Sequence, residues 1–179
     1  MDLVATLVKT RTMNFENYLK VILLHEGGLS NHPKDKGLIT KYGVSLRFLR
    51  KQGIDIDKDG DIDADDILGL TVHQAGVIYK QYFFEPLHAL PDGLLKLHVF
   101  DMGVNAGTRR AIKLLQYTLG VEQDGVIGKQ TLKALLSDSK AVEKYIKARI
   151  AFYNSLVESN SDLSVFLRGW LRRVKTTTF

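Results

Sequence analysis

The sequence predicts a mainly α-helical fold in a single domain. Apolar residues recur at helical spacing along most of the 179 residues, and only residues 40–44 resemble a strand. We find no low-complexity linker, no internal repeat and no domain boundary. The length and the 45% hydrophobic content are sufficient for one ordinary core.

The first predicted helix begins at Phe15, and its apolar stripe includes Leu19, Ile22 and Leu23. Gly27 and Gly28 end it. A loop with glycine and proline follows to Thr40, and then a short helix over residues 45–51.

The next predicted helix begins at Thr71 and runs towards Tyr82, and two prolines then bracket a turn. The remaining apolar stripes predict helices over residues 94–104, 110–119, 129–136, 142–156 and 163–174.

The charge of the chain is unevenly distributed. Its formal net charge is +5, but residues 55–66 hold seven of the 20 acidic residues and one of the 25 basic ones. That stretch carries −6 and the rest of the chain +11. A basic surface suits an anionic partner such as nucleic acid, anionic lipid or cell-wall polymer.

The acidic stretch DIDKDGDIDADD matches a twelve-residue EF-hand-like or dockerin-like calcium loop. Gly60 occupies the turn position and Ile62 the apolar position. We predict a structural Ca²⁺ here and no cofactor for catalysis; a solvated acidic loop is the alternative. The predicted metal-site residues are Asp55, Asp57, Asp59, Asp61, Asp63 and Asp66.

Other features exclude several classes. The chain has no cysteine, so it has neither a disulfide framework nor a thiol nucleophile. No apolar run has the length of a membrane span, so we expect no stable membrane insertion. The first residues do not resemble a signal peptide, so we expect synthesis in the cytoplasm.

Glu26 follows Ile22, Leu19 and Phe15 at helical spacing, which places it on the apolar side of the first helix. Burial and the negative end of the helix dipole both favour the protonated acid. A protonated carboxylic acid is the general acid of glycosidic bond cleavage. The alternative is a helix-end Glu that reaches solvent.

Residues 26–43, EGGLSNHPKDKGLITKYG, resemble the signature of glycoside hydrolase family 108, N-acetylmuramidases once grouped as secretion activators. Leu38 stands where a second glycine is usual, and Lys41 where Asn is usual. FDMGVNAG (100–107) is similar to a helix of that family. Residues 114–135 and 166–174 are similar to its peptidoglycan-binding segment.

The resemblance implies a lysozyme-like helical domain with a short β-like turn near its active site. We expect an extension over residues 1–13, a muramidase part over 14–108 and a peptidoglycan-binding part over 109–179 packed into the same domain. It further implies cleavage of the β-1,4 bond between N-acetylmuramic acid and N-acetylglucosamine, with Glu26 as acid.

Asp35 and Thr40 are the candidates for the second catalytic group, since their spacing from Glu26 is similar to that of phage-type lysozymes. A turn that returns them towards Glu26 would give an inverting geometry, with the carboxylates about 6.5–9.5 Å apart. Asp35 could instead stabilise its turn, and Thr40 could simply begin a strand.

Three other residues are candidates for substrate binding: Tyr42, Asp101 and Asn105. For Asn105 a helix-end role is the alternative. Arg149 lies within an apolar stripe, where an ion-paired or snorkelling arginine is usual. We interpret the basic residues Arg168, Arg172, Arg173 and Lys175 as a solvated helix face.

The expected partner is peptidoglycan rather than nucleic acid, and we expect a monomer that acts on the cell wall after release. The family also suggests a holin or a secretion partner. Two other hypotheses remain: a non-catalytic peptidoglycan-binding or secretion-assisting protein, and a calcium-dependent interaction module.

Overall fold

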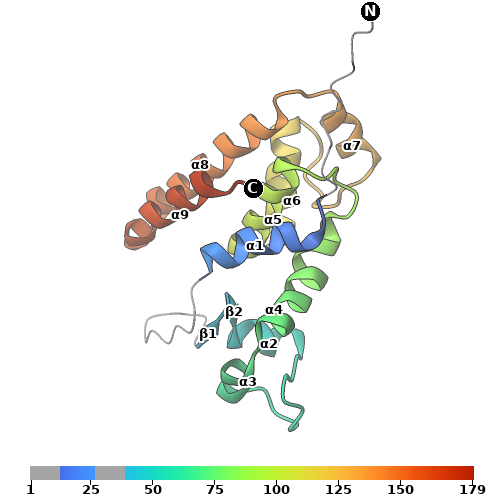
Figure 1. Ribbon diagram of the computed structural model, residues 1–179. Coiled ribbons are helices and arrows are strands. Elements are labelled where there is room, and N and C mark those ends of the chain that lie inside the picture. Colours follow the sequence, from blue (N-terminus) through green and yellow to red (C-terminus); the bar gives the residue numbers. More distant parts are fainter. Residues whose placement is uncertain (1–12, 27–38) are drawn as a thin grey trace, which may run out of the picture.

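The computed structural model describes residues 13–26 and 39–179, and helices account for most of these residues (Figure 1). The mainly α-helical prediction is therefore confirmed. The α-helices are α1 (Phe15–His25), α2 (Leu46–Gln52), α3 (Ala64–Gly69), α4 (Val72–Tyr79), α5 (Leu94–Ala106), α6 (Thr108–Leu119), α7 (Lys129–Leu136), α8 (Ala141–Ser159) and α9 (Ser164–Thr176). Strands β1 (Thr40–Lys41) and β2 (Val44–Ser45) form a hairpin.

Helix α1 has a definite beginning and end. Asn14 and Asn17 form a capping box, in which each side chain accepts a hydrogen bond from the other residue's backbone N–H. The helix ends at His25, and Glu26 is its C-cap residue with extended backbone angles. Glu26 therefore lies just beyond the last helical turn.

The hairpin pairs Thr40 with Ser45 and Lys41 with Val44, so its turn consists of Tyr42 and Gly43. Both turn residues have positive φ, 50° and 76°, as type I′ hairpin turns require. The strand-like pattern at residues 40–44 thus predicted a real but very short sheet.

Two apolar clusters form the interior (Figure 1). The larger lies among α1 and α5–α9 and includes Tyr18, Phe100 and Val174. The smaller lies below it in the figure, between the hairpin, α2, α3 and α4, and includes Leu49 and Ile67. Because α4 reaches both regions, it connects the small lobe to the helical body.

Two elements differ from the prediction. Helix α3 was not predicted, because its first turn is the end of the acidic stretch, where Asp63 and Asp66 form a capping box. Helix α4 ends at Tyr79 and continues as a π-helical turn over Lys80–Phe84, which apolar periodicity does not reveal. None of the helices in the described ranges is long and apolar enough to cross a membrane.

Candidate active site

Glu26 is held by an ion pair with a distant residue of the chain. Its Oε1 accepts a hydrogen bond from Nη1 of Arg173 on α9 at 2.7 Å. The Glu26 side chain is 17% exposed and that of Arg173 is 11% exposed. The carboxylate is therefore mostly buried, and a guanidinium compensates its charge.

The turn of the hairpin lies against the same carboxylate. A Cβ atom at Gly43 would overlap the Tyr79 hydroxyl and the Glu26 carboxyl group, with Oε2 only 2.5 Å away. The Tyr79 hydroxyl donates to the carbonyl oxygen of Tyr42 at 2.8 Å. Position 43 thus requires glycine, because its φ is positive and there is no room for a Cβ atom. The hydrogen bond from Tyr79 of α4 holds the turn beside Glu26.

Behind Arg173 lies Asp101 of α5, which has no exposed surface. Its Oδ1 accepts from Arg173 Nε at 2.8 Å, and its Oδ2 from Arg149 Nη2 at 2.5 Å and Thr177 Oγ1 at 3.2 Å. Burial alone would raise the pKa of Asp101, but the charges of Arg173 and Arg149 outweigh it and lower that pKa.

Two histidines border this network. Burial, together with the charge of Arg149, lowers the pKa of His98 to about 4, so its ring is neutral near pH 7. Because arginine can only donate, His98 Nδ1 accepts the 2.8 Å hydrogen bond from Arg149 Nη1. Burial also lowers the pKa of His25, the neighbour of Glu26.

The structure places the other predicted site residues as follows. Asp101 is fully buried, so no part of it reaches a surface that a sugar could contact. Asn105 lies in the last turn of α5 and accepts a hydrogen bond from Tyr153 Oη at 2.8 Å. Thr40 and Tyr42 are half-buried on the hairpin. Asp35 lies outside the described residues.

Sequence reasoning missed the partner of Glu26. Arg173 was assigned to a solvated basic face, and this is wrong because its guanidinium points inward onto two carboxylates. The hint was Val174, a buried neighbour within a basic run. For Arg149 the ion-paired alternative is confirmed, since its side chain has no exposed surface and pairs with Asp101.

The structure shows a role for Lys41, which stands where the family motif usually has Asn. Its Nζ donates to the carbonyl oxygen of Leu68 on α3 at 2.5 Å, and it also lies 5.6 Å from the centroid of the Tyr42 ring. The lysine therefore attaches the hairpin to α3, a contact that the shorter asparagine side chain would not reach.

The acidic loop connects α2 to α3, and most of its carboxylates are exposed. Its side chains accept hydrogen bonds from the loop's own backbone, such as Gly60 N–H to Asp55 at 3.0 Å. Repulsion by Asp59 and Asp63 raises the pKa of Asp61. Asp55, Asp57 and Asp59 form one group of carboxylates close enough to share a cation, and Asp61, Asp63 and Asp66 form another.

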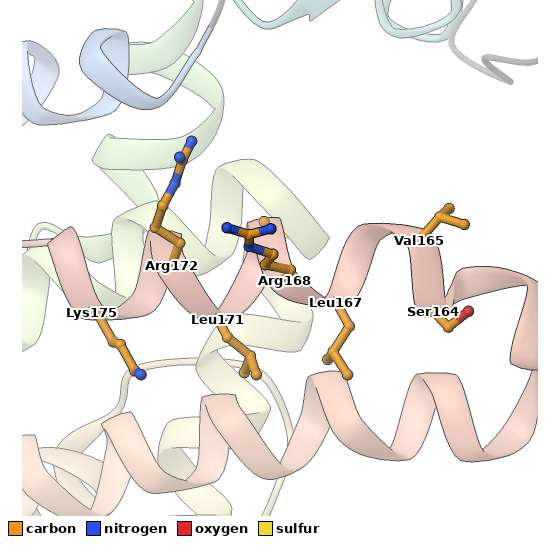
Figure 2. A pocket seen from close by; sticks show the side chains of 8 residues that line it. Ser164, Val165, Leu167, Arg168, Leu171, Arg172 and Lys175 are labelled. Carbon is orange, nitrogen blue, oxygen red and sulfur yellow. The ribbon is translucent and has the colours of Figure 1, made fainter.

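Two pockets border α9. One of about 260 Å³ is lined by His25 and Arg173, the neighbours of Glu26, together with Asn105 and Trp170. The other, of about 810 Å³, runs along the helix from Ser164 to Lys175 and does not include Glu26 (Figure 2). In Figure 2, Leu167 and Leu171 point towards the adjacent helix, whereas Arg168 and Arg172 point to the opposite side.

Comparison with known families and structures identifies the family of the chain. Residues 19–107 match the model of glycosyl hydrolase 108, and residues 110–175 match a predicted peptidoglycan domain. The chain belongs to the glycosyl hydrolase 108 family. It is also similar to the solved structure of Brucella abortus SagA, with 28% identity and a TM-score of 0.76 over 91% of this chain and 90% of that one. No curated protein matches.

Membership of this family, with the second segment, makes the chain a glycoside hydrolase that acts on peptidoglycan. The family that the sequence motifs suggested is thus confirmed. Glu26 and Asp101 belong to the first matched segment, and Arg173 belongs to the second. The charged network therefore lies where the two segments meet.

Proposed function

We propose that the chain is a lysozyme-type N-acetylmuramidase, which hydrolyses the β-1,4 bond from N-acetylmuramic acid to N-acetylglucosamine with Glu26 as general acid. The observation that carries this proposal is the fixed carboxyl group of Glu26 at the edge of the hairpin. Arg173 and the hairpin turn hold this carboxyl group in one orientation within the hydrolase segment, and it remains partly exposed.

The two oxygens of Glu26 have different surroundings, which suits a proton donor. Oε1 is engaged by Arg173, while Oε2 lies on the side of Gly43. Oε2 is therefore the oxygen that would carry the proton and donate it to the leaving glycosidic oxygen. A Cβ atom at position 43 would overlap Oε2, so glycine is what allows the turn to approach this oxygen.

We propose Asp35 and Thr40 as the residues that supply the second catalytic group. Thr40 begins β1, two residues before the turn that borders Glu26. Asp35 would activate water or stabilise the oxocarbenium-like transition state, and Thr40 would orient the water through its hydroxyl. Replacing Asp35 by Asn should lower kcat, and the anomeric form of the first product would distinguish inversion from retention.

Tyr42 and Asn105 are the residues that we propose for direct contacts with the substrate. Tyr42 is the first residue of the hairpin turn, and Asn105 lines the small pocket next to Arg173. Asp101 could act only through Arg173, because it has no exposed surface.

The decisive experiment is digestion of purified peptidoglycan, followed by borohydride reduction and mass analysis of the fragments. The wild type should release fragments that end in reduced muramic acid, and Glu26→Gln should release none. Glu16→Gln is a matched control, since Glu16 is an exposed acid on the same helix. Equal activity of Glu26→Gln and wild type, or fragments ending in reduced glucosamine, would reject the proposal.

We further propose a structural Ca²⁺ in the loop Asp55–Asp66. Six aspartates occupy ligand positions of the twelve-residue pattern, and helices α2 and α3 flank the loop. Ca²⁺ should raise the melting temperature in chelator-treated protein, and Asp57→Ala should abolish that rise. Asp65→Ala is the control, because position 11 is not a ligand position. An equal response of both variants would contradict the site.

A further inference from the structure

The two matched segments interlock through one series of charged contacts. Glu26 of the hydrolase segment binds Arg173 of the peptidoglycan segment, and Arg173 binds Asp101 of the hydrolase segment. Asp101 in turn binds Arg149 of the peptidoglycan segment, and Arg149 binds His98 of the hydrolase segment. Every contact in this series crosses from one segment to the other.

We propose that Arg173 is the positioning residue of Glu26, supplied to the active site by the peptidoglycan segment. The second segment would then complete the catalytic site instead of only attaching it to the wall. This inference rests on the proposed role of Glu26 as general acid.

The geometry around Arg173 favours a positioning role because the guanidinium is held at two points. Its Nε binds Asp101 at 2.8 Å and its Nη1 binds Glu26 at 2.7 Å. Asp101 is itself fixed by Arg149 and Thr177, so Arg173 cannot rotate without breaking a buried pair. A planar fork with several donors can bridge two carboxylates in this way, whereas a lysine ammonium makes a less directional contact.

Helix α9 has other anchors, so its attachment does not depend on Glu26. Val174 is buried in the main apolar cluster. The Trp170 ring stacks on Tyr153 of α8, with ring centroids 5.2 Å apart. The contact from Arg173 to Glu26 is therefore available to orient the carboxyl group, and its loss need not release the helix.

The charged or titratable groups around the Glu26 carboxyl group, within the described ranges, are His25, Tyr79, Asp101, Arg149 and Arg173. Among these residues, Arg173 is the one whose side chain forms an ion pair with Glu26.

The test uses the full chain and four variants assayed on soluble peptidoglycan fragments. In Arg173→Met, kcat should fall about 10- to 100-fold with KM within about twofold of wild type, as expected for a misplaced catalytic group. Arg173→Lys should recover part of kcat, since it restores the charge. Lys175→Met changes an exposed residue of the same helix and should retain the wild-type kcat and KM.

The outcomes separate this inference from the proposed function. A wild-type kcat in Arg173→Met, or an equal loss in Arg173→Met and Arg173→Lys that follows the unfolded fraction measured by circular dichroism, overturns the positioning role. The fourth variant, Glu26→Gln, tests the acid itself. If it is as active as the wild type, the proposed function fails first. If it is inactive while Arg173→Met is fully active, only the positioning role fails.

Discussion

The two acidic regions of this molecule balance their charge in opposite ways. In the loop Asp55–Asp66 the carboxylates are close in sequence and mostly exposed, and they bind backbone N–H groups of the same loop. Around Asp101 the carboxylates are buried and bind arginines that lie 48 to 147 residues away in the chain.

This difference shows how burial determines the partner that a carboxylate needs. In water, neighbouring aspartates repel one another only moderately, and a cation or solvent can compensate them. In the interior an unpaired charge is far more costly, so a buried carboxylate requires fixed partners, which at Asp101 are the guanidinium groups of Arg149 and Arg173. The exposed loop carboxylates therefore need no guanidinium partner, while the network fixes the relation between α1, α5, α8 and α9.

The largest expected effect comes from breaking the buried network at Arg149. Arg149→Met leaves Asp101 with one arginine and removes the donor to His98, so we expect a loss of about 3–5 kcal/mol in the free energy of unfolding. Urea denaturation measures it. Lys147→Met on the same helix removes only an exposed pair with Glu143 and should cost less than about 1 kcal/mol. Similar losses in the two variants would contradict the distinction between buried and exposed pairs.

The pH dependence of Asp101→Asn tests the same network. The pKa of Asp101 is lowered on folding, so its stabilising contribution is present above the unfolded value of about 3.9 and is lost as the pH falls through the folded pKa. Asp101→Asn should therefore be destabilised by several kcal/mol at pH 7, about the value for a broken buried pair. Melting curves should approach those of the wild type only below about pH 4. A constant difference down to pH 2 would contradict the assignment.

A smaller effect is expected where the small lobe contacts Glu26. Gly43→Ala imposes positive φ on alanine and brings its Cβ onto Tyr79 and Glu26, so we expect a loss of about 1–3 kcal/mol and a marked fall in activity. Gly53→Ala is the matched control. It has φ of 66° with open space around the Cβ position, and should therefore lose stability but retain activity.

The sequence predicted the regions whose partners lie nearby in the chain. Helix α1, the hairpin and the acidic loop were predicted because apolar spacing and the aspartate pattern are local signals. The family motif also directed attention to Glu26. Helix α3 was missed because its capping aspartates were assigned to metal binding alone.

The partners of Glu26 could not be predicted, because tertiary packing decides which face of α9 is buried. Arg172 and Arg173 are adjacent in sequence, but only Arg173 is directed inward onto Asp101. In the same way, nothing local to Tyr79 indicates that its hydroxyl reaches the hairpin turn 37 residues earlier in the chain. Such contacts between distant residues follow only from how the helices pack.

The smallest effect is expected in the acidic loop. The pKa of Asp61 is raised by its neighbours, so ionisation of this group disfavours the folded loop, and that penalty disappears as the pH falls through the raised pKa. In chelator at pH 7, Asp61→Asn should raise the melting temperature by about 1–2 °C, a size usual for surface substitutions in a chain of this length. This gain in melting temperature should disappear on acidification. It should disappear at a higher pH than the pH at which Asp101→Asn becomes as stable as the wild type. If Asp61→Asn instead lowers the melting temperature in chelator, the loop carboxylates do not repel one another in the folded protein. The proposed difference between the loop and the buried network would then be wrong for the loop.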